Sequence, residues 1–390
     1  MPRRSAPAPV GSLEELLATR EIVVSCGSGG VGKTTTAAAA AAMAATHLGG
    51  KVLVLTVDPA RRLANALGLE AFGNVETQVP ARAFTEAGRE PRGELWAAML
   101  DTKQSWDDLV RAHAPDEATR DAILSNPLYQ NITGRFVQSH DYIAMERLYE
   151  LHASGRYDLI VVDTPPTRNA IDFLEAPERM AEFFSSRLLR WLTVPARSRV
   201  LTMASKPFYT VADRILGSKF LEDIAEFFLL FQTMYDGFVE RAKAVTRLLE
   251  DSRTTFVVVS TLESAPLAEA EFFIDALKER RLHLGAVVLN KVLPDLFLAD
   301  GAAAAAQRLT KAPEEVAAAL PAELGDPAQV ARVLREVGES YLNFQVVATR
   351  EAATRREIAA APEVVAAVPY FTGDITDLGG LLELGERIWR

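Results

Sequence analysis

A glycine-rich loop near the N-terminus constrains the fold of this chain more than any other feature. The segment Gly27–Thr36 reads GSGGVGKTTT; it follows the apolar run Ile22–Val24 and leads into the alanine-rich stretch Ala37–Ala45. Glycine permits backbone conformations that other residues avoid, and alanine favours helix. This order therefore predicts a strand, a tight loop and a helix. The loop fits the pattern G-x-x-x-x-G-K-[ST] of phosphate-binding loops, with Lys33 and Thr34 in the last two places.

Each residue type in this loop suits a bound nucleotide. Main-chain N–H groups and the positive end of the helix attract phosphate oxygens. Lys33 can reach the β- and γ-phosphates, and the Thr34 hydroxyl can ligate Mg²⁺. A glycine turn with an incidental lysine is the simpler alternative, and the complete pattern argues against it. The candidate nucleotide-binding residues of the loop are Gly27, Ser28, Gly29, Gly30, Val31, Gly32, Lys33, Thr34 and Thr35.

Short apolar runs along the chain predict the fold class. They are rich in Val, Ile and Leu and nearly continuous, as expected for strands that are buried on both faces of a parallel sheet. Helical stretches separate them, so we expect a doubly wound, mainly parallel α/β sheet with an α-helical insert subdomain. The runs are 22–26, 52–57, 159–163, 256–260 and 286–290.

The domain organisation follows from the same pattern. We expect a flexible N-terminus over 1–20 with a short helix at its end, then one phosphate-loop domain over 21–390 with helical inserts at about 101–154 and 171–250. Within and after the second insert, we expect the following elements: a long helix through 221–249, a helical portion over about 300–360, a last strand within 362–371 and a last helix over 378–389.

Two acids are expected beside the glycine loop, because ligands of such sheets bind beyond the carboxyl ends of the strands. Asp58 follows the second run, and Asp163 ends the apolar residues of the third. Asp163 forms a Walker B element that helps to hold hydrated Mg²⁺, and Asp58 can orient water or contact Mg²⁺ through water. Taken alone, Asp58 before Pro59 is also a common helix start, since Asp caps and Pro suits the first turn.

Composition excludes several classes of protein. The net charge of −10 argues against non-specific binding to nucleic acid. A single cysteine, Cys26, rules out a disulfide within the chain and cysteine-cage metal sites, and its place in a strand predicts a buried residue rather than a reactive thiol. Neither a secretory signal nor a transmembrane window of about twenty apolar residues occurs. We expect a cytoplasmic protein, either free or peripheral at the inner face of the membrane.

At this point the chain resembles a known family. The loop, the Asp58-Pro59-Ala60 segment and the Asp163–Thr167 segment (DTPPT) are similar to those of the arsenite-pump ATPase ArsA and the related ATPases that target tail-anchored proteins. The resemblance implies a Mg²⁺-dependent ATPase that works as a nucleotide-driven dimer and handles a membrane-related client. The ATPases of that family act on tail-anchored proteins or on transported anions.

The resemblance also assigns roles to single residues. It implies that Asp58 is the catalytic, water-polarising residue and acts with Lys33, and that Asn290 hydrogen-bonds adenine. Glu263 is a weaker match to an acidic residue near the nucleotide. Asp163 begins switch II, whose remaining residues here are Thr164, Pro165, Pro166 and Thr167.

This chain departs from the family in two ways. The family's signature lysine, which reaches the partner's phosphates across the dimer, is replaced by Ser28. Either a switch arginine (Arg61, Arg62 or Arg168) supplies the charge in a homodimer, or a paralogue that carries the lysine completes a heterodimer. The lone cysteine also leaves no C-x-x-C pair, so we expect no zinc site and no arsenite activation. The five histidines show no ligand spacing and are interpreted as structural or surface residues.

The second insert carries an apolar stripe over 224–249. Its aromatic and methionine residues permit two interpretations: a packed helical subdomain, or a groove for an apolar helix or membrane-protein client.

Two other functions stay open. The chain could be a partition or positioning ATPase, a class that is usually shorter and often ends in a basic amphipathic helix. It could also be a nucleotide-dependent heterodimer subunit with little hydrolysis of its own.

Overall fold

A single eight-stranded sheet forms the centre of the molecule. The computed structural model describes residues 11–57, 62–69, 73–133, 137–165, 170–185, 226–358, 364–371 and 373–389. The strand order is β3-β4-β2-β5-β1-β6-β7-β8, and only β3 runs antiparallel to its neighbour. This confirms the expected mainly parallel α/β class. The strands are β1 (Ile22–Cys26), β2 (Lys51–Thr56), β3 (Thr77–Gln78), β4 (Glu94–Met99), β5 (Leu159–Asp163), β6 (Thr254–Ser260), β7 (Leu284–Val292) and β8 (Val364–Pro369).

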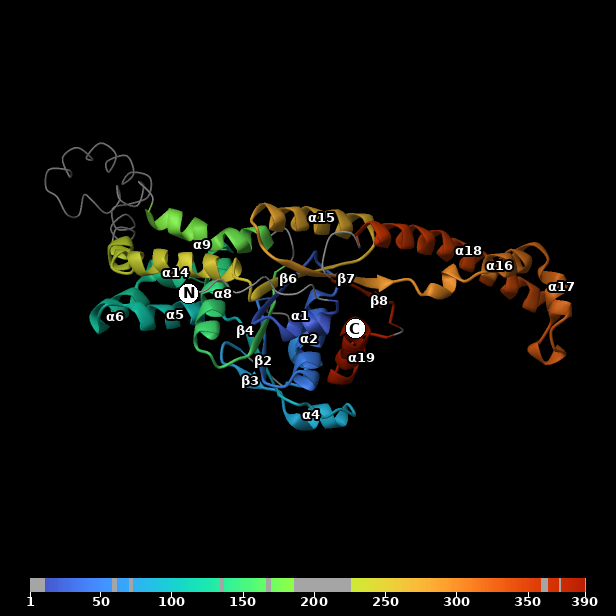
Figure 1. Cartoon of the computed structure of the whole chain (residues 1–390), viewed down its shortest axis with the longest axis horizontal. Helices are drawn as coiled ribbons and strands as arrows, with labels where there is room; N and C mark the ends of the chain where they lie inside the picture. The colour runs from blue at the N-terminus through green and yellow to red at the C-terminus, as the bar shows by residue number, and fades with distance from the viewer. Residues whose placement is uncertain are drawn as a thin grey trace.

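Helices cover both faces of the sheet (Figure 1). One face packs on α1 (Leu13–Ala18), α2 (Lys33–His47), α3 (Arg62–Ala66), α4 (Ala81–Glu86) and α19 (Leu378–Trp389). The core on the other face is shared with α5 (Thr102–His113), α6 (Glu117–Ser125), α7 (Pro127–Thr133), α8 (Val137–Ala153), α9 (Ala170–Ser185), α14 (Tyr235–Leu249) and α15 (Ser264–Glu279). Alternate residues of each central strand enter the two cores, which is why those strands are apolar almost throughout.

Helix α2 places the glycine loop at the carboxyl edge of the sheet. Its run of alanines is buried on nearly all sides, between the sheet and α19. Small side chains allow this close approach, and the tightest point is at Gly385 of α19. A Cβ added there would lie 2.2 Å from Cγ of Met43. The alanine-rich sequence therefore serves packing as well as helix propensity.

One expected helix is interrupted. The residues described within 221–249 form a helix over 226–232, a turn at Thr233 and Met234, and then α14. The break brings Phe231, Met234 and Phe238 into the same core, where the rings of Phe231 and Phe238 stack with centroids 6.0 Å apart. The apolar spacing continues across the turn, so the sequence pattern does not predict the break.

Most of the large residues of the apolar stripe that the structure describes are buried in the core. Phe227, Phe231, Met234, Phe238 and Val245 are all less than a tenth exposed and pack against α5, α7 and α8. These residues support the packed-subdomain interpretation over a client groove. Several other candidates for that groove, such as Met203 and Phe208, lie outside the described residues.

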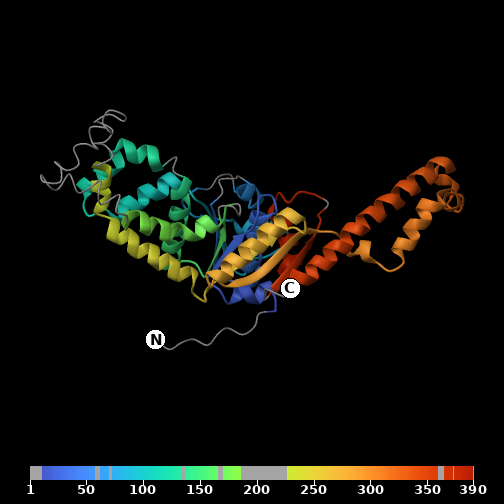
Figure 2. The same cartoon turned by 90° about the horizontal axis from the view of Figure 1, so that it is seen from above.

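Helices α5 to α9 and α14 form a helical lobe at one end of the sheet. A helical arm projects from the opposite end (Figures 1 and 2). It contains η2 (Asp295–Leu298), α16 (Ala302–Lys311), α17 (Pro313–Ala318), η3 (Ala322–Leu324) and α18 (Pro327–Ile358). The helical content expected over 300–360 is confirmed, whereas its projection away from the sheet was not foreseen. Nowhere in the described ranges does a helix combine the length and apolar character that crossing a bilayer requires.

Candidate nucleotide site

The glycine loop has a shape that only glycine allows at two of its positions. A Cβ on Gly27 would lie 2.0 Å from the carbonyl oxygen of Val259 in β6. Gly32 has φ +96°, and a Cβ there would lie 2.3 Å from Nδ2 of Asn290. The loop is thus pressed against the ends of β6 and β7. The loop therefore curves into a cradle, and α2 begins directly after it at Lys33.

Lys33 and Thr34 open helix α2 and lie at the mouth of this cradle. The Lys33 side chain is only 7% exposed, and its Nζ donates a hydrogen bond of 3.1 Å to the carbonyl oxygen of Ser28. The ammonium group is therefore curled over the loop, where phosphate oxygens would meet it. No acidic residue occupies the first turn of α2, so the positive end of the helix dipole is not offset there.

Asp163 joins the loop to the sheet. Its carboxylate is fully buried at the end of β5, and Oδ2 accepts hydrogen bonds from the hydroxyls of Thr34 (2.7 Å) and Thr56 (3.0 Å). Strand register explains the meeting, because Thr56 of β2 and Ser25 of β1 are the direct neighbours of Asp163. All three lie on the face of the sheet that α2 covers.

Sequence reasoning gave no role to Thr56. The sequence shows that Thr56 lies near the end of an apolar run, but it does not show that this strand lies beside β5 in the sheet. The strand order that brings β2 beside β5 supplies the missing information.

The start of the predicted switch II is fastened to β1. The main-chain N–H and the hydroxyl of Thr164 donate to the carbonyl oxygen of Ser25, at 3.2 and 2.8 Å. Pro165 is the last residue described before α9. The remaining predicted residues of the switches, Asp58, Pro166 and Thr167, lie outside the described residues, as do Arg61 and Arg168.

Asn290 reaches the loop from β7. Its Nδ2 donates a hydrogen bond of 2.7 Å to the carbonyl oxygen of Val31. Its Oδ1 accepts from the N–H of Lys291, which adopts φ +58°. The structure thus brings this residue to the loop. Glu263 is exposed at the N-cap of α15, after β6, and makes no capping hydrogen bond.

The residues present fit a phosphate group with a hard cation. Within the described part of the chain, the buried Ser28 hydroxyl has no hydrogen-bond partner, which suits a ligand at the loop. The Thr34 hydroxyl and the Asp163 carboxylate meet at 2.7 Å, and both offer the oxygen ligands that Mg²⁺ prefers. The described residues contain no cluster of three or more His, Cys, Asp or Glu side chains suited to a metal. Magnesium would therefore take most of its ligands from water and phosphate.

Cys26 lies directly before the loop and is buried. It is 1% exposed, and burial raises the pKa of its thiol to about 12. Hydrogen bonding to Thr164 and the charge of Lys33 oppose this shift but do not cancel it. The prediction of a buried structural cysteine is confirmed.

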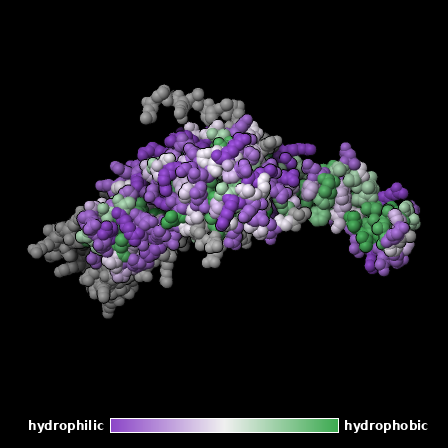
Figure 3. Space-filling view, turned by 90° about the horizontal axis from the view of Figure 1, so that it is seen from below, coloured by the Kyte–Doolittle hydropathy of each residue, from purple (hydrophilic) through white to green (hydrophobic). Residues whose placement is uncertain are grey.

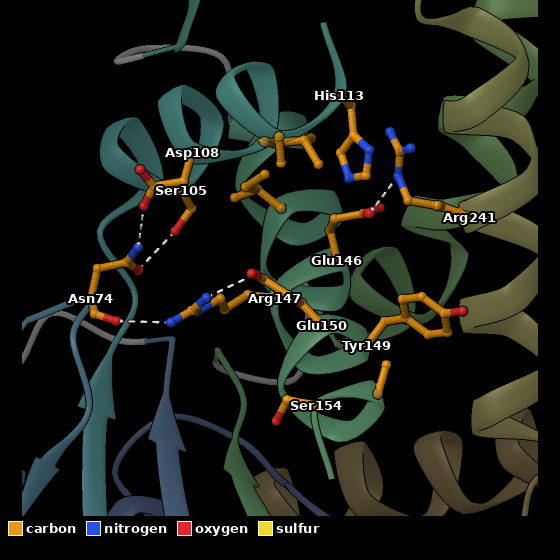
Figure 4. Close-up of a pocket in the computed structure, with 14 residues that line it drawn as sticks. Asn74, Ser105, Asp108, His113, Glu146, Arg147, Tyr149, Glu150, Ser154 and Arg241 are labelled. Atoms are coloured by element: carbon orange, nitrogen blue, oxygen red, sulfur yellow. Dashed lines mark hydrogen bonds and ion pairs between the residues drawn. The ribbon is translucent and has the colours of Figure 1, made fainter. Parts of the chain in front are cut away.

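Away from the glycine loop, a hollow lies in the helical lobe and is lined by residues of α5, α8 and α14 (Figure 4). Its volume is about 460 Å³. Arg241 pairs there with Glu146 at 2.6 Å, and burial raises the pKa of Glu146 against the effect of that arginine. Arg147 bonds the carbonyl oxygen of Asn74, which anchors α8 to the segment before β3. Arg147 also pairs with Glu150, and none of the lining residues belongs to the glycine loop.

Comparison with known proteins agrees with this geometry. Residues 20–312 match the model of the family described as anion-transporting ATPase. The chain belongs to this family. It is therefore related to ATPases, and nucleotide binding is a property of that family as a whole.

Individual relatives are distant. The chain is 23% identical over 278 residues to putative arsenical pump-driving ATPase 2 of Aquifex aeolicus, covering 69% of this chain and 79% of that one. It is 26% identical over 288 residues to putative arsenical pump-driving ATPase 1 of the same organism, covering 70% of this chain and 64% of that relative's length. ATPase get3 of Aspergillus terreus is 27% identical over 281 residues, with 70% and 73% covered.

Proposed function

We propose that this protein is a Mg²⁺-dependent ATPase whose nucleotide cycle drives a dimer that handles a membrane-related client. The observation that supports hydrolysis most directly is the hydrogen bond from Thr34 to Asp163, next to Lys33, which curls over the glycine loop. A cation, a hydroxyl and a buried carboxylate are the groups that a magnesium-bound triphosphate needs.

The proposed roles follow from these positions. The loop N–H groups and Lys33 bind the β- and γ-phosphates, while Thr34 and Asp163 hold magnesium directly and through water. The metal would neutralise charge that develops on the phosphate oxygens. Asp58, two residues after the end of β2, orients the attacking water. Asn290 contacts adenine after exchanging its bond to Val31 for one to the base, and Glu263 flanks the nucleotide.

Calorimetry with Mg·ATP tests the binding half of this proposal. We expect Lys33→Ala and Gly27→Ala to abolish binding, and Asp163→Asn to weaken it chiefly when magnesium is present. Turnover tests the other half: Asp58→Asn should retain binding and lose hydrolysis. If Lys33→Ala binds Mg·ATP as the wild type does, the proposed site is wrong.

A second candidate is a heterodimer subunit with little hydrolysis of its own. It is favoured by Ser28, which occupies the place of the lysine that the family uses in trans and is only 6% exposed. Serine brings no charge, and a trans cation contributes several powers of ten in rate. Purified chain that turns ATP over rapidly, with loss in Asp58→Asn, would refute this candidate.

A positioning ATPase is disfavoured by the last helix. The apolar side of α19, including Leu381, Leu384 and Ile388, is buried against the sheet and α2. It is therefore committed to the core and cannot insert into a membrane surface without unfolding. Sedimentation with anionic liposomes and ATP checks this, and we expect the protein to stay in the supernatant.

The client is the least constrained part of the proposal. Because most large residues of the described stripe are buried, a client surface on this insert would need a nucleotide-driven rearrangement or other residues. Apolar-dye binding compared between ADP and a non-hydrolysable ATP analogue tests this. We expect stronger dye binding in one of the two states, and equal binding would argue against client handling by the insert.

A further inference from the structure

The projecting arm is a helical hairpin built for rigidity. Helix α18 has 32 residues and packs along α16 in the opposite direction. At their contact, a Cβ on Gly338 would lie 2.7 Å from both the carbonyl oxygen of Ala306 and Oγ1 of Thr310. This close packing fixes one side of α18. The adjacent side stays exposed between Val333 and Val347.

The exposed side of α18 carries an apolar stripe. Val333, Val337, Phe344 and Val347 are 54, 52, 48 and 43% exposed. With Ser340 they recur at alternating intervals of four and three residues, which is the a/d spacing of a coiled-coil seam. Figure 3 shows hydrophobic colour gathered on the arm, in contrast to the hydrophilic surface of the body. A soluble protein rarely leaves such a stripe uncovered.

The residues beside this stripe fit a second copy of the same helix in the opposite direction. Glu336, Asn343 and Arg350 are exposed and occupy the same flanking position in successive heptads. When two such helices pair antiparallel about Asn343, Glu336 of each copy faces Arg350 of the other. In the same register Phe344 faces Ser340, so that a large residue meets a small one.

The parallel alternative lacks this complementarity. In a parallel pair Phe344 would face Phe344 and Ser340 would face Ser340. Glu336 would lie beside the uncharged Tyr341 of the other helix, and Arg350 beside Arg355, a like charge. Charge and size both favour the antiparallel register.

We propose that the arm is a self-association element, in which the α18 stripes of two copies pair antiparallel about a two-fold axis at Asn343. The association needs no nucleotide and is independent of the proposed ATPase function. It joins two chains through a surface outside residues 20–312, the part that the family model matches.

Charge reversal tests the pairing in the full-length protein without nucleotide. Sedimentation equilibrium should show a monomer–dimer equilibrium for the wild type. Glu336→Arg and Arg350→Glu should each raise the dimer dissociation constant by about fivefold or more, since two attractive pairs become repulsive. The double variant Glu336→Arg/Arg350→Glu should restore dimerisation to near the wild-type value.

Cross-linking provides a test of register. In Asn343→Cys the two thiols would lie close to the axis, so a short bis-maleimide should yield a covalent dimer. The matched control, Glu339→Cys, is exposed one turn away on the same helix and lies farther from the stripe than Asn343, so it should cross-link much less. The buried native cysteine gives a silent background.

Several outcomes would overturn the proposal. A wild-type protein that stays monomeric at all concentrations would leave the stripe to a different partner. Single charge variants that dimerise normally, or a double variant weaker than both singles, would exclude the antiparallel register. Circular dichroism of each variant, with the same helical signal as the wild type, separates lost pairing from lost folding.

Discussion

At the scale of single residues, the glycine loop depends on one contact with a neighbouring strand. Gly27→Ala would place a methyl group 2.0 Å from the carbonyl oxygen of Val259, and neither backbone can move without disturbing the sheet. Gly30→Ala is the matched control, because Gly30 also has positive φ (+80°) but no atom within 4 Å of an added Cβ. We expect Gly30→Ala to cost about 1–2 kcal/mol of folding free energy. Gly27→Ala should cost more and eliminate Mg·ATP binding; chemical denaturation and calorimetry measure the two effects. Equal losses in the two variants would contradict this account.

Cys26 gives a second prediction at this scale. A thiol with a pKa near 12 is protonated at pH 8, and its burial also blocks reagents. We therefore expect no reaction of the native protein with a disulfide reagent such as DTNB at pH 8 over an hour, and one equivalent of reaction in denaturant. Since Cys26 is the only cysteine, labelling then reports unfolding of the sheet centre. Rapid labelling under native conditions would show that β1 opens locally.

The sequence predicts most of this site because its chemistry is concentrated in local motifs. Lys33, Thr34 and Asp163 could be named from short patterns, and the structure brings them together as expected. Thr56 could not be assigned in this way, because its partner lies 107 residues away and depends on strand order. Local patterns specify the loop and the acid, whereas long-range pairing selects the residues around them.

At the scale of elements, the contact between α2 and α19 yields a test of packing. Gly385→Ala would bring a Cβ within 2.2 Å of Cγ of Met43, while Gly379→Ala on the same helix meets only ordinary contacts. Alanine gains up to about 1 kcal/mol over glycine in a helix, and overpacking costs about 1–3 kcal/mol. We expect Gly379→Ala to be neutral or stabilising and Gly385→Ala to be destabilising in thermal melts. Met43→Ala combined with Gly385→Ala should recover part of the loss; a purely additive double variant would show that the two residues do not interact.

The more completely a strand is buried, the more clearly its sequence predicted it. The central strands β1 and β5 match the expected ranges because both their faces are covered and their residues are continuously apolar. Strand β4 was missed: it alternates between buried and half-buried residues and contains two alanines, which are poor strand formers. The two-residue β3 has too little sequence to show a period. Helix α14 begins later than expected. The turn before it leaves the apolar spacing unchanged, so the spacing does not predict that turn.

The whole molecule has two surfaces proposed to meet a second chain: the nucleotide edge of the sheet and the arm. If two copies cooperate in hydrolysis, turnover per chain must rise with protein concentration until the dimer is saturated. Pairing through the arms holds two chains together and raises the effective concentration of one nucleotide edge near the other. The wild type should therefore reach full turnover at a lower concentration than a variant whose arms repel each other.

Glu336→Arg makes this argument measurable. It lies on the exposed arm and outside the proposed nucleotide site, so turnover at saturating protein should equal that of the wild type. The midpoint of the rise should move to about fivefold or more higher protein concentration, in proportion to the loss of arm pairing, and Glu336→Arg/Arg350→Glu should return it. Steady-state ATPase assays over a dilution series measure both quantities. A wild-type turnover independent of dilution, in a range where sedimentation shows dissociation, would separate hydrolysis from dimerisation. A midpoint that Glu336→Arg leaves in place would show that the arm pair and the catalytic pair are different assemblies.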